Sequence, residues 1–238
     1  MIHDLKNKII SNTIINGGMR VLVAITGFIS VPIFLKYLGA TQYGLFLYLQ
    51  IFSTIGIVGL FDLGLKSAMV KYIAEYKTEN NREKEKSIIF SSYLLLIIIS
   101  LIVFAFGFNS IDLIIGYLKI PSEFRLEFKQ GLIFVLISTI IILPANVCAG
   151  ALEGHLLYKM IRVFEFTTLF IFYFFSFYFL YKGLGFLTII KVYILCNIFK
   201  SLLYLIYTNK YYTNVKFRFS IKNQMKIIGF SNRMFFTN

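Results

Sequence analysis

Six apolar stretches alternate with short polar segments along this chain of 238 residues. A helix needs roughly 20 apolar residues to cross about 30 Å of hydrocarbon, and each stretch is near or above that length. The pattern therefore predicts an all-α, polytopic membrane protein. The predicted spans are Thr13–Tyr37, Thr41–Leu65, Ser87–Phe108, Gly131–Gly150, Val163–Tyr181 and Leu184–Tyr207.

The last part of the chain breaks this rhythm. Residues 208–226 are polar and basic, which predicts a linker on the cytoplasmic side. Residues 227–238 are apolar again, but they are too few to cross a bilayer. We therefore expect an amino-terminal six-helix bundle over residues 1–207, the linker, and the start of a seventh helix in a chain that is truncated.

Composition and charge agree with a membrane protein and set its orientation. The chain is 58% hydrophobic and carries a net charge of +13. Its Lys and Arg lie in loops and not on one folded face, which disfavours a nucleic-acid partner. Fifteen of them fall in the amino terminus and the second, fourth and sixth loops, against five in the other loops. Because positively charged loops are retained inside, the amino terminus is predicted to be cytoplasmic.

Ionisable residues inside a span are candidates for function, because a charge in hydrocarbon costs several kcal/mol. Asn12, Asn16 and Arg20 recur every four residues in the first span, so one face of that helix is polar. This face is expected to look into a bundle or cavity. Asp62 lies at a similar depth in the antiparallel second span. We predict an Arg20–Asp62 ion pair, with Lys66 as a competing partner.

The sixth span carries a second polar stripe. Tyr193, Asn197, Lys200 and Tyr204 recur at helical spacing, whereas Lys191 lies on the opposite face near the outer end. Lys200 is therefore the candidate base of a cavity. The alternative is that Lys200 extends its ammonium to the inner interface.

The sequence carries no sign of catalysis or of a bound metal. It lacks GxxxxGK, HExxH, GxSxG and DxD, so we expect neither an NTP-driven pump nor an enzyme. His3 and His155 have no ligand spacing to a second His, Cys or carboxylate, so no metal is assigned. Cys148 and Cys196 lie in apolar spans and are expected to be small buried side chains. No cofactor is expected.

Two short motifs suggest a family. LGATQYG at Leu38–Gly44 and DLGLKSA at Asp62–Ala68 resemble the LGxxxYG and DLGL signatures of Wzx-type repeat-unit flippases, within the MATE-like multidrug/oligosaccharidyl-lipid/polysaccharide exporter superfamily. The resemblance covers about residues 10–76. It implies a pair of six-helix bundles around a cationic cavity in the bacterial inner membrane. Such a protein moves an undecaprenyl-pyrophosphate-linked oligosaccharide to the outer leaflet during O-antigen, lipopolysaccharide, capsule or exopolysaccharide biosynthesis.

The resemblance also gives the polar residues their expected roles. Arg20 and Lys200 would bind the pyrophosphate through charge-assisted hydrogen bonds. Asn16, Gln50 and Asn197 would contact sugar hydroxyls. The expected partners are the lipid-linked oligosaccharide, membrane lipids, and polysaccharide polymerase or assembly proteins.

Three other functions stay open at this point. A drug exporter of the same superfamily would call for a deep carboxylate in the first bundle, where this chain has Arg20. A membrane-embedded polymerase or glycosyltransferase would call for a large outer loop with catalytic bases, and residues 109–130 are too few for that. A scaffold for polysaccharide assembly would leave no mark in the sequence.

Overall fold

The computed structural model describes residues 2–53, 56–62 and 64–212, and for residues 2–16, 20 and 58 it describes the backbone only. Over these ranges the structure is helical, without strands. Five segments are long and apolar enough to cross a membrane. The elements are α1 (Ile2–Ile51), η1 (Ile57–Asp62), α2 (Leu65–Thr78), α3 (Arg82–Asn109), α4 (Ile111–Tyr117), η2 (Ser122–Phe124), α5 (Arg125–Gly154), α6 (Tyr158–Tyr181) and α7 (Phe186–Tyr211).

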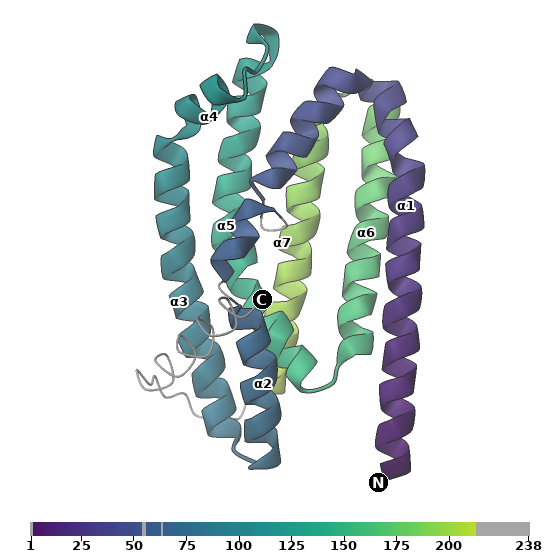
Figure 1. Ribbon diagram of the computed structural model, residues 1–238, viewed down its shortest axis with the longest axis vertical. Coiled ribbons are helices and arrows are strands. Elements are labelled where there is room, and N and C mark those ends of the chain that lie inside the picture. Colours follow the sequence, from purple (N-terminus) through teal and green to yellow (C-terminus); the bar gives the residue numbers. More distant parts are fainter. Residues whose placement is uncertain (1, 54–55, 63, 213–238) are drawn as a thin grey trace.

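Four of the predicted spans are single helices in the structure. Helices α3, α5 and α6 contain the third to fifth predicted spans and begin before them, and α7 covers the sixth predicted span from Phe186 onward. They stand side by side and are joined by short connections (Figure 1). The all-α class and the membrane-spanning character are confirmed. The count of six crossings stays a prediction, and residues 213–238, with most of the predicted linker and the seventh helix, lie outside the described residues.

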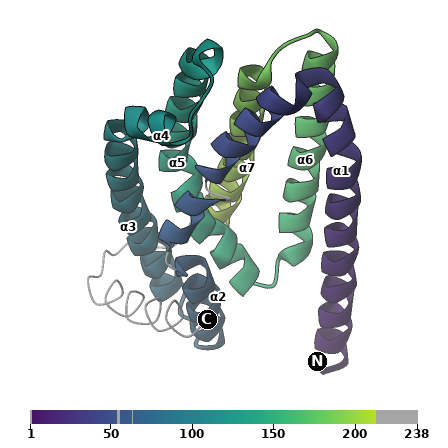
Figure 2. The ribbon, with the colours of Figure 1, turned by 45° about the horizontal axis from the view of Figure 1, so that its top comes forward.

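Helix α1 consists of two limbs that meet at Gly39. This residue has a φ of 72° and a ψ of 169°, a backbone conformation that favours glycine. The first limb rises from the amino terminus, and the second descends across the bundle towards η1 and α2 (Figures 1 and 2). The first limb contains the first predicted span.

The prediction of one continuous helix over Thr41–Leu65 is wrong. The second limb of α1 ends at Ile51, and the chain continues through a turn into η1 and then α2. The Gly56 N–H donates to the Ser53 carbonyl at 3.0 Å. A Cβ on Gly56 would lie only 2.1 Å from the Ile51 carbonyl oxygen, so this turn requires glycine. Hydropathy does not detect such a break, because the broken segment is as apolar as a helix.

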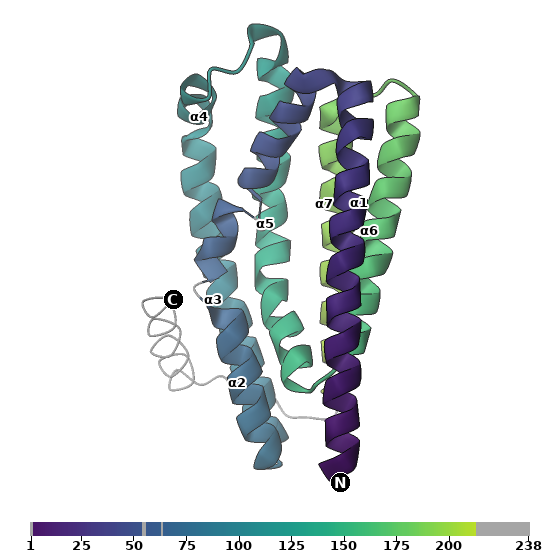
Figure 3. The same cartoon turned by 45° about the vertical axis from the view of Figure 1, so that its right-hand side comes forward.

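The basic segments gather at one end of the bundle. The amino terminus, the α2–α3 and α5–α6 connections and the end of α7 lie together at that end (Figures 1 and 3). We call it the basic end. At this end Asn81 directly precedes α3, and its side chain accepts a hydrogen bond from the Lys84 N–H at 3.0 Å and so caps the helix. The arrangement agrees with the alternation of charge along the sequence.

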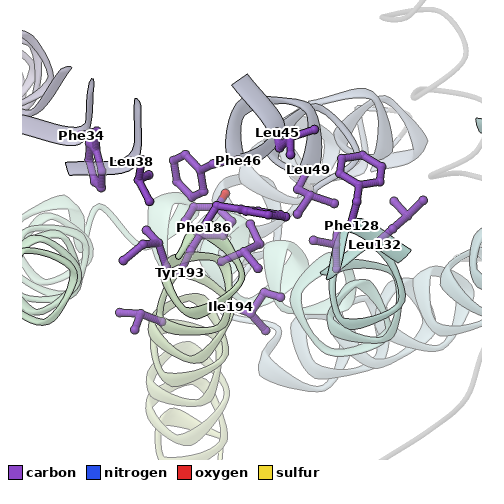
Figure 4. Packing of buried hydrophobic residues seen from close by; sticks show 14 of the residues in the cluster. Phe34, Leu38, Leu45, Phe46, Leu49, Phe128, Leu132, Phe186, Tyr193 and Ile194 are labelled. Carbon is purple, nitrogen blue, oxygen red and sulfur yellow. The ribbon is translucent and has the colours of Figure 1, made fainter. Parts of the chain in front are cut away.

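The core forms where the second limb of α1 crosses α5 and α7. Figure 4 shows Leu45, Phe46 and Leu49 of this limb beside Phe128 and Leu132 of α5 and beside the start of α7. Packing of side chains, and not exclusion of water, holds helices together inside a bilayer. The crossing therefore fixes the lower end of the second limb, where the chain breaks, against α5 and α7.

Candidate functional site

The regular helical backbone breaks after α1, between Ile51 and η1. It lies near mid-height of the long helices (Figure 1). Unsatisfied backbone groups in hydrocarbon cost several kcal/mol, so irregular backbone at membrane depth is tolerated only inside protein or beside a water-filled cavity. Ser53 satisfies part of the break, because its hydroxyl donates to the Gln50 carbonyl at 2.7 Å. The Ser53 side chain is buried.

A chain of hydrogen bonds connects this break to the polar stripe of α7. The Ser53 hydroxyl has one hydrogen, which it gives to Gln50, so the Tyr193 hydroxyl donates to Ser53 across 3.3 Å. The Asn197 amide donates to the Tyr193 carbonyl at 2.9 Å, and the Lys200 ammonium donates to the Asn197 amide oxygen at 3.0 Å. We call Ser53, Tyr193, Asn197 and Lys200 the polar seam. The structure thus brings Asn197 and Lys200 together and joins them to the break.

Lys200 is the charged member of the seam. Its ammonium interacts electrostatically with Glu165 of α6 and with Lys66 of α2. Glu165 is already paired with Arg162, and Lys66 with Glu153 at 2.8 Å. Within the described part of the chain, no carboxylate lies within 4.0 Å of the Lys200 ammonium. Its hydrogen-bond partner in the structure is the Asn197 amide oxygen.

A cavity of about 380 Å³ lies between the two limbs of α1 and helix α6. Gln50 lines it, together with the hydroxyl-bearing side chains of Ser30, Tyr43 and Tyr173. The Ser30 hydroxyl donates to the Gly27 carbonyl at 2.8 Å and lies 3.4 Å from the Tyr173 hydroxyl. The ring of Phe34, which also lines the cavity, stacks on Tyr43 at a centroid distance of 5.9 Å. Amide, hydroxyl and aromatic groups together can contact a polar ligand that has an apolar face.

Two predicted site residues cannot be placed in this cavity. Asn16 and Arg20 lie in the first limb of α1, but their side chains are outside the described part of the structure. The predicted Arg20–Asp62 pair therefore stays a prediction. The Asp62 carboxylate interacts with the backbone N–H and the ammonium of Lys66. Lys66, the competing partner named from the sequence, pairs instead with Glu153 at 2.8 Å, and among the described residues no ion pair within 4.0 Å joins it to Asp62.

A second polar group lies at the basic end, and sequence reasoning missed it. The Tyr212 hydroxyl donates to a Glu85 carboxylate oxygen at 2.6 Å, and His155 Nε2 lies 2.6 Å from the Tyr212 hydroxyl and 3.1 Å from the same carboxylate oxygen. We call these three buried residues the inner cluster. They come from α3, the α5–α6 connection and the residue after α7. His155 looked isolated because its partners are distant in the sequence.

The geometry of the inner cluster fixes its protons. Since the Tyr212 hydroxyl gives its hydrogen to Glu85, its oxygen accepts from His155 Nε2–H. Burial and then the hydrogen bond to the Glu85 carboxylate raise the pKa of Tyr212 above its ordinary value. Tyr212 therefore remains a neutral donor. The cluster joins α3, the α5–α6 connection and the end of α7 at one end of the bundle.

The fold and these sites define a class: a multi-pass membrane protein whose second predicted span is interrupted beside a polar seam. A family model described as polysaccharide biosynthesis protein matches residues 9–238. The chain belongs to this polysaccharide biosynthesis family. Searches of curated proteins and of solved structures each gave no match.

Proposed function

We propose that this protein is an exporter that moves an undecaprenyl-pyrophosphate-linked oligosaccharide repeat unit from the cytoplasmic to the outer leaflet of the bacterial inner membrane. Family membership over residues 9–238 supports the link to polysaccharide biosynthesis. The basic end would face the cytoplasm, since positively charged loops are retained there. The protein would act as a transporter and not as an enzyme.

The break in the backbone after α1 is the observation that supports the transport part of the proposal. Many transporters bind substrate where helices are discontinuous, because the interruption supplies polar groups at membrane depth. Here the interruption joins a seam that ends in Lys200. A pyrophosphate suits such a site for two reasons. Its oxygens accept several hydrogen bonds, and its negative charge neutralises the Lys200 cation.

The cavity between the α1 limbs suits the sugar part of the same substrate. Gln50, Ser30, Tyr43 and Tyr173 offer donors and acceptors to hydroxyl groups, and Phe34 offers an aromatic ring. Asn16 and Arg20 would add to this surface as the resemblance implies. The polar seam and the cavity would then hold different parts of one amphiphilic molecule.

The decisive experiment compares the leaflets in cells with and without this gene. We expect cells that lack it to accumulate the lipid-linked repeat unit in the inner leaflet, out of reach of membrane-impermeant reagents. Complementation should restore the outer-leaflet pool. An unchanged distribution between the leaflets in the deletion strain would refute the proposal.

Lys200→Ala tests the assigned cation, and Lys191→Ala is the matched control on the same helix. Lys191 is exposed and lies over the Phe134 ring, away from the seam. Loss of a charge-assisted hydrogen bond weakens binding by about 1.5–3 kcal/mol, or roughly ten- to a hundredfold. We expect export to fall with Lys200→Ala and to persist with Lys191→Ala. Equal export activity of the two variants would show that Lys200 is not part of the binding site.

A further inference from the structure

A crevice lies at the basic end between α3 and α7, away from the polar seam. Both helices pack on α5, and a space of about 350 Å³ is left between them. Cys148 of α5 lies among the lining residues and is itself 3% exposed. The walls are apolar and are formed by Ile89, Phe90 and Tyr93 of α3 and by Leu205 and Ile206 of α7.

The polar lining of the crevice is concentrated at its basic-end side. Lys86, which lines it, donates to the Tyr212 carbonyl at 3.2 Å. Arg82, one turn earlier on α3, lies with its guanidinium 5.5 Å from the Tyr211 ring centroid. The nearby Glu85 carboxylate is buried and bound by the Tyr212 hydroxyl. Two cations therefore stand beside an apolar crevice.

Tyr212 connects the crevice to the inner cluster. Its side chain lines the crevice, while its hydroxyl is held by Glu85 and His155. Tyr212, Glu85 and His155 come from separate elements, and together they hold this part of the crevice wall in place. A ligand that fills the crevice would contact a preformed surface and would not have to order it.

We propose that this crevice binds an anionic phospholipid, with one acyl chain between α3 and α7 and its phosphate beside Lys86 and Arg82. The anionic phosphate complements the positive charges of Lys86 and Arg82. Basic pockets between helices at the cytoplasmic side of a membrane bind anionic head groups in this way. The apolar walls suit an acyl chain. A volume of about 350 Å³ is enough for part of one acyl chain. The inference rests on the proposed function only for the statement that the basic end faces the cytoplasm.

The test uses the full chain reconstituted in phosphatidylcholine vesicles that contain a trace of phosphatidylglycerol with a diazirine in its acyl chain. Adducts are mapped by mass spectrometry after illumination. We expect them to concentrate on the crevice residues of α3 and α7. Unlabelled phosphatidylglycerol should compete for these positions, and unlabelled phosphatidylcholine should not.

Paired variants separate head-group recognition from chain binding. Each Lys near the membrane surface contributes about 1 kcal/mol to attraction of anionic lipid, so Lys86→Gln should lower the crevice labelling about fivefold. Lys86→Arg should retain it. Lys159→Gln is the control, since it removes an exposed cation of α6 at the same end. Leu205→Trp should fill the crevice and suppress adducts, whereas Leu101→Trp on the exposed face of α3 should not.

Three results would overturn the proposal. Labelling spread evenly over exposed residues of α3 and α7 in every variant would show ordinary surrounding lipid. Equal competition by both lipids would exclude recognition of the anionic head group. Absence of adducts on the crevice residues of the unsubstituted protein would show that the space does not hold a lipid. Photolabelling requires no transport, so its outcome is separate from that of the leaflet experiment.

Discussion

Helices α5 and α1 differ sharply in how much of their surface the rest of the bundle covers. In the segment Ser122–Gly154, which contains α5, 67% of the most apolar stretch is buried, against 17% in the α1 segment Gly17–Ile51. Gly154 brings the α5 backbone against Ile73 of α2, whereas Gly27 of α1 has open space beside it. We call α2, α3 and α5 the packed sector, and the first limb of α1 the open limb.

The difference suggests a division of labour within the bundle. The packed sector supplies Glu85 of the inner cluster and holds the Lys66–Glu153 pair, so its helices are fixed by both packing and polar contacts. The open limb contacts α6 and borders the cavity that Gln50 lines. Substitutions should therefore cost stability in the packed sector and affect function, but not stability, at the open limb.

The largest expected effect on stability comes from substituting Glu85. Glu85→Ala removes the partner of both Tyr212 and His155 in a buried site, and breaking such a group costs about 3–5 kcal/mol. The thermal melting temperature of the purified protein should fall accordingly. Glu79→Ala is the control, because Glu79 forms an exposed pair with Lys84 that should contribute little. Equal melting temperatures for the two variants would contradict the assignment of the inner cluster.

The next effect compares two glycines directly. A Cβ at Gly154 would lie 2.7 Å from the Ile73 Cβ, so Gly154→Leu overpacks the α2–α5 contact and should cost about 1–3 kcal/mol. Gly27→Leu should leave the melting temperature unchanged, because no atom lies within 4 Å of the added Cβ. If Gly27→Leu proved as destabilising as Gly154→Leu, the open limb would not be open.

The smallest effect concerns the hydrogen bond that joins the break to α7. Tyr193→Phe removes the donor to Ser53 and should cost about 1 kcal/mol, the usual worth of a neutral hydrogen bond. A double-mutant cycle with Ser53→Ala measures the coupling between the two hydroxyls. Tyr178→Phe at an exposed position serves as the control. Additive effects of the two substitutions would show that the bond contributes nothing.

Much of the fold was readable from the sequence because apolar length and charge alternation report it directly. The helices α3, α5, α6 and α7 follow from hydropathy alone. The break in the second predicted span does not, since it depends on the contact between Gly56 and the Ile51 carbonyl. Hydropathy averages over such a turn. A glycine after Ser53 is a weak signal, and apolar residues on both sides conceal it.

The candidate site was predictable only where its residues share one helix. Asn197 and Lys200 recur at helical spacing, and the structure joins them by a hydrogen bond. Glu85, His155 and Tyr212 come from three elements, so their meeting depends on how α3, α5 and α7 pack. Their charges could be read from the sequence, but their proximity could not. The same limit applies to Ser53 and Tyr193.

The account depends most on the claim that the second limb of α1, which ends at the break, borders water at membrane depth. The direct measurement replaces Cys148 and Cys196 by Ala and introduces single cysteines at Gln50, Gly27 and Leu101. Labelling with a membrane-impermeant thiol reagent should be fast at Gln50→Cys and Gly27→Cys, which line the cavity, and slow at Leu101→Cys on the exposed apolar face of α3. Cavity positions as unreactive as Leu101→Cys would contradict the account.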